Sequence, residues 1–145
     1  MQIEKIEPTK WNQIEIHFAH IIAEIREGVQ GQTSEKSRDI TIRKKTISFL
    51  NGTKMHCTEF IKNDYIDFYF YDLIGPNNLP IIKFHSERHE DKTYQTTTEP
   101  FHIHARAGYD DLKLEKRLPN PKYKKLDDIL TFIEYSEYHV PISKK

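Results

Sequence analysis

Apolar residues near the start of the chain recur in steps of three and four, which is the spacing of one face of an α-helix. The residues that follow this spacing are Trp11, Ile14, Phe18, Ile21 and Ile25. Thr9 can cap the first turn and Gly28 can end the last one, so we predict an N-terminal helix between them. The next segment, residues 28–39, is rich in Gly, Gln, Ser and Thr, which predicts a mobile loop.

From residue 40 the pattern changes to the alternation of apolar and polar residues that is typical of strands. Turns are indicated by Asn-Gly at 51–52, by Asn-Asp at 63–64 and by Gly-Pro-Asn-Asn at 75–78. These turns and a polar loop at 90–99 separate five predicted strands, at residues 40–50, 54–61, 65–73, 80–88 and 101–106.

The third predicted strand, residues 65–73, is rich in aromatic residues. Side chains in a strand point alternately to its two faces. We therefore predict that Ile66, Phe68 and Phe70 face the core. The same alternation places Tyr69 and Tyr71 on the opposite face, where they could stack on the bases of a single-stranded nucleic acid.

A second helix is predicted near the end of the chain, where Leu126, Ile129, Leu130 and Ile133 share one helical face. The acidic pair at 127–128 suits the first turn of this helix because the helix dipole is positive there. The order of helix, strands and helix predicts a single α+β domain over residues 1–145. We expect an antiparallel meander of about five strands, with the helices packed on one face of the sheet.

Two clusters of titratable residues flank the polar loop. They consist of His85 and Glu87 in the fourth predicted strand with His89 directly after it, and of His102, His104 and Arg106 in the fifth. Alternate residues share a face, so these groups lie together on the face away from the core if the two strands pair. Titratable side chains gathered in this way indicate an active site more than a packing solution.

We interpret the clusters as the site of a metal-independent ribonuclease that needs no cofactor. Histidine suits the base and the acid of RNA cleavage by the 2′-hydroxyl because its unperturbed pKa is about 6.5. An arginine can stabilise the charge of the pentacovalent phosphate. The predicted catalytic residues are His85, His89, His102, His104 and Arg106. The predicted substrate-binding residues are Tyr69, Tyr71, Glu87, Tyr94, Lys113 and Arg117.

Two other interpretations of the clusters stay open. His102 and His104, together with His85 or Glu87, could form a facial set of metal ligands, but Arg106 would repel a cation there. Alternatively, the histidines are polar surface groups without a chemical role. The sequence contains no phosphate-binding Gly-rich loop, no HExxH motif and no Gly-x-Ser-x-Gly motif, so it does not support a nucleotide triphosphatase, a zincin or an α/β-hydrolase.

The composition narrows the choice of partners. Lys plus Arg (22) equals Asp plus Glu (22), so no overall field attracts the chain to nucleic acid or membranes. Any basic surface must be local, and residues 113–125 are the candidate stretch. Cys57 is the only cysteine, which excludes an internal disulfide and predicts a small buried side chain. No apolar run approaches the ~18 residues of a membrane span, so we expect a cytoplasmic protein.

His85, His89, the segment Glu99-Pro100-Phe101-His102-Ile103-His104 and the closing helix together resemble the TumE-like family of type II toxin–antitoxin toxins. The resemblance covers roughly residues 65–133. It implies a small toxin that attacks RNA or translation and is inactivated by a cognate antitoxin, often a helix-turn-helix repressor. It also implies functional roles for His85, His89, His102, His104 and Glu99.

The first functional hypothesis is therefore a toxin-like ribonuclease with RNA as its substrate. The alternative is a non-enzymatic module that binds nucleic acid or protein within a phage-defence or CRISPR-related system. Replacement of the imidazoles separates the two hypotheses, because an enzyme would lose activity by orders of magnitude while a binding module would lose affinity in proportion to its contacts.

Overall fold

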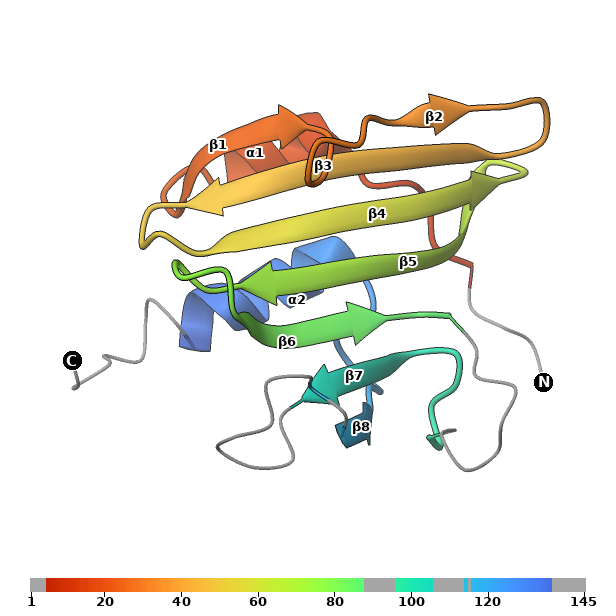
Figure 1. The fold of residues 1–145 in the computed structure, drawn as a ribbon. Coiled ribbons are helices and arrows are strands. Elements are labelled where there is room, and N and C mark those ends of the chain that lie inside the picture. The colour runs from red at the N-terminus through yellow and green to blue at the C-terminus, as the bar shows by residue number, and fades with distance from the viewer. Residues whose placement is uncertain (1–4, 88–95, 106–113, 115, 137–145) are drawn as a thin grey trace.

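The computed structural model describes residues 5–87, 96–105, 114 and 116–136. Within these ranges eight strands form one antiparallel sheet, which two helices accompany (Figure 1). The helices are α1 (Trp11–His17) and α2 (Leu126–Glu134). The strands are β1 (Ile22–Glu27), β2 (Glu35–Lys36), β3 (Thr41–Phe49), β4 (Lys54–Lys62), β5 (Tyr65–Ile74), β6 (Pro80–His85), β7 (His102–Ala105) and β8 (Lys116–Pro119).

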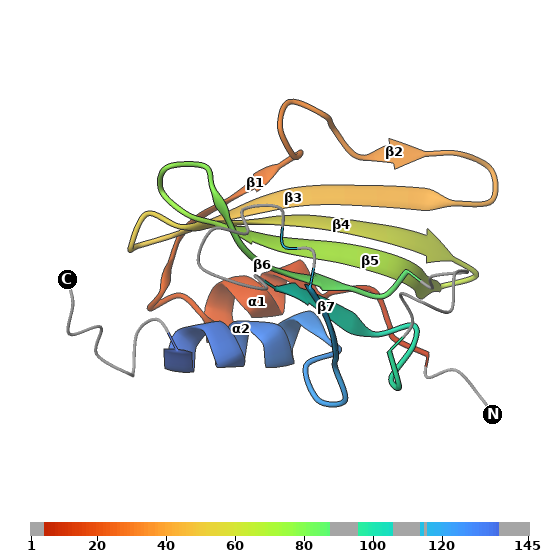
Figure 2. The same cartoon turned by 60° about the horizontal axis from the view of Figure 1, so that its bottom comes forward.

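The strands follow the order β1-β3-β4-β5-β6-β7-β8, and β2 pairs with β3 beside β1. From β3 to β8 each strand pairs with the next one in the chain, so this part of the sheet is a meander. Both helices lie on one side of the sheet, as Figure 2 shows. We call this side the helix face and the other side, which is toward the viewer in Figure 1, the open face.

The core lies between the helix face and the helices. α2 contributes Leu126, Ile129, Leu130 and Ile133, which are all buried. Burial of one such side chain stabilises the fold by about 1.5–3 kcal/mol relative to leaving it exposed. Cys57 is buried as well, as the sequence predicted. Neither helix in the described ranges has the length and apolar character needed to cross a bilayer.

The predicted α+β class is confirmed, and the predicted strands from 40 to 106 correspond to β3–β7. Three strands were not predicted. β1 lies in the segment that was assigned to the first helix, and β8 lies in the basic stretch 113–125, for which no strand was predicted. β2 is only two residues long and belongs to the segment predicted to be a mobile loop, which also contains a turn closed by Val29 and Gln32.

The first helix is shorter than predicted. α1 ends at His17, and the segment Ile22–Glu27 pairs with β3 instead of continuing the helix. Isoleucine is β-branched and fits a strand well, so hydrogen bonds to the edge of β3 outweigh a helical spacing of apolar residues here. The predicted cap is also wrong, because the Thr9 hydroxyl donates a hydrogen bond to Glu59 and Lys10 occupies the N-cap position.

The two faces of β5 are largely the reverse of the prediction. The strand alternates as expected, but its buried positions beyond Ile66 are odd-numbered. The buried side chains are Tyr69, Tyr71 and Leu73, and those on the open face are Phe68, Phe70 and Asp72. Tyr69 and Tyr71 therefore lie in the core, where their rings stack with centroids 4.3 Å apart.

A β-bulge near Asp67 causes this reversal. Phe60 of β4 pairs with Phe68, whereas the next residue, Ile61, pairs with Ile66. Between these two pairs β4 advances by one residue and β5 by two, so β5 contains one extra residue. Because side chains alternate with a period of two, one extra residue moves every later side chain to the other face.

Candidate three-histidine site

The pairing of β6 with β7 brings two histidines opposite each other on the open face. His85 pairs with His102, and two residues further along β7 His104 pairs with Lys83. Residues directly opposite in an antiparallel pair have side chains on the same face. The shared histidine face that the sequence predicted for these two segments is therefore confirmed.

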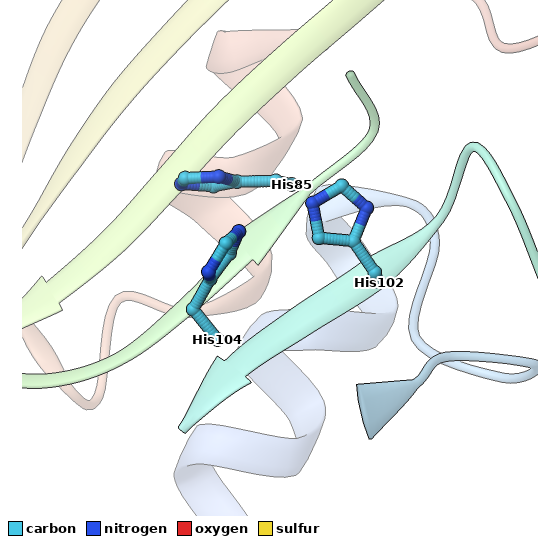
Figure 3. A group of neighbouring side chains, drawn as sticks. All are labelled: His85, His102 and His104. Atoms are coloured by element: carbon cyan, nitrogen blue, oxygen red, sulfur yellow. The ribbon is translucent and has the colours of Figure 1, made fainter. Parts of the chain in front are cut away.

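The rings of His85, His102 and His104 converge, as Figure 3 shows. Ring centroids are 4.6 Å apart for His85 and His104, 4.9 Å for His102 and His104, and 5.9 Å for His85 and His102. Each ring contributes one nitrogen to a group whose members all lie within 4.8 Å of one another. His102 is fully buried and the other two are half-buried. We call this group the three-histidine site.

Two of the rings are oriented by hydrogen bonds to acceptors. Nε2 of His85 lies 2.9 Å from Oδ1 of Asp72 on β5. Nδ1 of His102 lies 2.9 Å from the carbonyl oxygen of Pro100 and 3.6 Å from Oε2 of Glu99. A carboxylate and a carbonyl can only accept, so these ring nitrogens carry protons. When each ring is neutral, its other nitrogen bears the lone pair.

This arrangement has the features of a metal site. Histidines that bind metals usually donate their second ring N–H to a carboxylate or a backbone carbonyl, as His85 and His102 do here. Three imidazoles suit zinc, copper, iron or nickel. An ion ~2.1 Å from each nitrogen would hold the nitrogens about 3.4 Å apart, so binding would draw the rings together by about 1 Å.

Two cationic residues lie beside His104 in the same row of the sheet. Lys83 of β6 and Arg117 of β8 are its direct neighbours on either side. Their charges would weaken the binding of a metal cation by repulsion, while Asp72 and Glu99 oppose this effect. The same cations would attract a phosphate group, and arginine can bind phosphate through two parallel hydrogen bonds.

Part of the predicted site is brought together. Three of its histidines converge, and Arg117 lies in the row of His104. Glu87 is exposed and lines a cavity next to β5 rather than the cluster. Glu99, which the family resemblance indicated, lies near His102. The predicted residues that lie outside the described ranges are His89, Tyr94, Arg106 and Lys113.

The predicted stacking residues Tyr69 and Tyr71 do not belong to this site, because the bulge in β5 places them on the helix face. The same bulge brings Asp72 and Phe70 to the open face, where both contact His85. Sequence reasoning missed these two residues. The signal that could have found them is a shift of the alternation in residues 65–73 by one position.

A second polar group lies on the helix face. Glu59 is fully buried, and its Oε2 accepts hydrogen bonds from the Tyr71 hydroxyl at 2.5 Å and from the Thr9 hydroxyl. Burial raises the pKa of Glu59 above its ordinary value, and the two hydrogen bonds offset part of this rise. Burial also raises the pKa of the Tyr71 phenol. This group lies within the core and does not contact the three histidines.

No known protein family, curated protein or solved structure matches the chain. The resemblance to the TumE-like toxins therefore stays a prediction.

Proposed function

We propose that the protein is a metal-dependent nuclease that cleaves RNA at the three-histidine site. The observation that carries the proposal is the convergence of three ring nitrogens within 4.8 Å of one another. Asp72 and the Pro100 carbonyl support it, because they hold two of the rings in the tautomers that present lone pairs for a ligand. Three protein ligands leave a coordination position for a water molecule, which is the pattern of catalytic zinc sites.

The residues around the site have complementary roles in this proposal. A bound divalent ion would act as a Lewis acid and lower the pKa of a water molecule toward ~7. Lys83 and Arg117 would bind the non-bridging oxygens of the phosphodiester and stabilise the charge that develops on them. Attack of the water oxygen on phosphorus would break the bond to the leaving oxygen, and the proton that the water loses would be balanced by the proton that the leaving oxygen takes up.

A second candidate is the metal-independent ribonuclease that the sequence predicted. It uses the same imidazoles, one as base for the 2′-hydroxyl and one as acid for the leaving oxygen. The observation that favours it is the position of His104 between Lys83 and Arg117, because two cations disfavour a bound metal and favour a pentacovalent phosphate. The two candidates differ in one measurable property, which is their dependence on a metal.

The first measurement is the metal content of the protein. Protein purified without chelators or metal-affinity resin is analysed for bound metals and then dialysed against Zn²⁺ or Co²⁺. We expect about one ion per chain in the wild type and none in the double variant His102→Ala/His104→Ala. His56→Asn is the matched control, because His56 lies on the open face of β4 but outside the three-histidine site.

The second measurement is cleavage of labelled RNA by the same proteins. Cleavage that EDTA abolishes and Zn²⁺ restores supports the metal-dependent nuclease. Cleavage that persists in EDTA and disappears only in the double variant supports the metal-independent candidate instead. If the folded wild type cleaves no RNA either with bound metal or in EDTA, both candidates are wrong.

A further inference from the structure

Three phenylalanines form a continuous aromatic surface on the open face. The rings of Phe60 and Phe68 stack with centroids 4.1 Å apart and planes 18° from parallel. Phe70 meets them at 5.9 Å and 5.7 Å with planes at 87° and 70°. On its other side Phe70 contacts the ring of His85 at 4.7 Å. We call these three residues the phenylalanine cluster, and it adjoins the three-histidine site directly.

The phenylalanine cluster is not part of the core. Each of its members is only partly buried, whereas Phe84 on the helix face is completely buried. A contiguous apolar surface that a folded domain leaves partly exposed is commonly a binding surface. Aromatic rings are suited to planar ligands, because stacking is tolerant of the ligand's identity and needs only a flat face.

Positive charge lies on the open face toward the histidine side of the cluster. Lys83 on β6 and Arg117 on β8 lie in the row of residues next to that of Phe70, and Lys54 lies further along β4. On the other side of the cluster, Lys44 is paired with Glu35. Lys54 and Lys83 form no ion pair with a carboxylate in the part of the chain that the structure describes. The carboxylate of Asp72 on this face is paired with His85. The chain as a whole is neutral, so this local excess of positive charge favours an anionic ligand.

We propose that the phenylalanine cluster binds unpaired bases of a single-stranded nucleic acid. The strand would stack its bases on Phe60, Phe68 and Phe70, and its phosphates would contact the lysines of the open face. Its backbone would then pass the three-histidine site beside Arg117. That last step rests on the proposed function, whereas the binding of bases does not.

A single strand fits these features better than a duplex does. The bases of a duplex are paired and stacked on one another, so aromatic side chains on a sheet can reach only bases that are unpaired. Single-stranded RNA and DNA share this chemistry, and the test below includes both.

Fluorescence anisotropy with end-labelled oligonucleotides of about 12 nucleotides tests the proposal. The probes are single-stranded RNA, single-stranded DNA of the same sequence and duplex RNA, all in EDTA so that a metal contributes nothing. Phe68→Leu keeps an apolar side chain but removes the ring, and we expect roughly 5- to 150-fold weaker binding of single strands. Phe68→Tyr keeps the ring and should bind like the wild type. Phe132→Leu is the matched control, because Phe132 is partly buried on α2.

Weaker single-strand binding in Phe68→Leu, with unchanged binding in Phe68→Tyr and Phe132→Leu, supports the proposal. Tighter binding of single-stranded RNA than of DNA, or the reverse, indicates which of the two is the natural ligand. Either result supports the proposal. Duplex binding as tight as single-strand binding overturns it, and so does an unchanged affinity in folded Phe68→Leu. Absence of binding by the wild type also overturns it and would indicate a protein partner for the open face.

The double variant His102→Ala/His104→Ala separates this proposal from the proposed function. We expect it to lose metal and cleavage while it still binds single strands through the phenylalanine cluster, whereas Phe68→Leu keeps its metal. If the wild type binds single strands through Phe68 but holds no metal and cleaves nothing, the proposed function fails and the binding proposal stands.

Discussion

Glu59 and Asp72 lie on the neighbouring strands β4 and β5 but on opposite faces of the sheet. Glu59 is on the helix face and accepts hydrogen bonds from the hydroxyl groups of Thr9 and Tyr71. Asp72 is on the open face and accepts a hydrogen bond from His85. Both carboxylates thus accept hydrogen bonds from other side chains, but the donors lie on different faces of the sheet.

The hydrogen bonds of Glu59 run to Tyr71 in the core and to the half-buried Thr9 at the edge of the core. Its second oxygen, Oε1, is buried and has no hydrogen-bond partner in the described residues, which favours the protonated acid. The hydrogen bond of Asp72 orients a ring whose other nitrogen can serve a ligand together with His102 and His104. The hydrogen bonds of Glu59 contribute only to the stability of the fold. The hydrogen bond of Asp72 orients a ring nitrogen of His85 and so can contribute to the binding of a ligand.

The largest expected difference between the two faces is in stability, at two phenylalanines on adjacent strands. Phe84 is fully buried on the helix face, and Phe70 is partly buried on the open face. We expect Phe84→Ala to lower the free energy of unfolding by about 3–5 kcal/mol. Phe70→Ala should lower it by less than about 1.5 kcal/mol. Urea denaturation followed by circular dichroism measures both, and equal losses would show that the open face is packed like the core.

The sequence was sufficient for elements with a long periodic pattern. β3–β7 and α2 were predicted because their apolar residues alternate or share a helical face and because turn residues separate them. The histidines could be placed together for the same reason. His102 and His104 are two residues apart on a strand, and the predicted pairing with the segment of His85 is the one observed.

The sequence was not sufficient where two patterns fit equally well. In β5, the set Phe68 and Phe70 and the set Tyr69 and Tyr71 are both aromatic, so either set could face the core. Only the pairing with β4 shows the bulge that decides between them. The orientation of Asp72 toward His85 depends on that bulge, so this part of the site could not be predicted from alternation.

The second-largest effect is expected for the hydrogen bond between His85 and Asp72. Asp72→Asn replaces the carboxylate that orients the His85 ring by a neutral amide, so we expect a 10- to 100-fold loss of affinity for Co²⁺ or Zn²⁺, as is typical of outer-shell residues. Asp67→Asn is the matched control, because Asp67 is an exposed carboxylate on the same strand. Isothermal titration calorimetry measures both affinities. Equal affinities in the two variants would mean that Asp72 does not support a metal site.

The smallest effect is expected for Glu59→Gln, and its sign depends on pH. Burial raises the pKa of Glu59 in the folded chain above its ordinary value of 4.5, which applies to the unfolded chain. At a pH between 4.5 and the raised pKa, Glu59 is therefore ionised in the unfolded chain but protonated in the folded chain. The free energy of unfolding therefore falls as the pH rises through this interval, and the loss is complete above the raised pKa. Glutamine does not ionise, and its amide oxygen can still accept hydrogen bonds from Thr9 and Tyr71.

Urea denaturation of the wild type and Glu59→Gln from about pH 4 to about pH 8 isolates this contribution, because every other titrating group is common to both proteins. We expect the wild type to lose stability relative to the variant as the pH rises, by about 1 kcal/mol. Parallel stability curves would mean that Glu59 ionises equally in the folded and unfolded chain. Burial of Glu59 would then have no effect on its ionisation. The two faces of the sheet would in that case differ only in the histidines that gather on the open face.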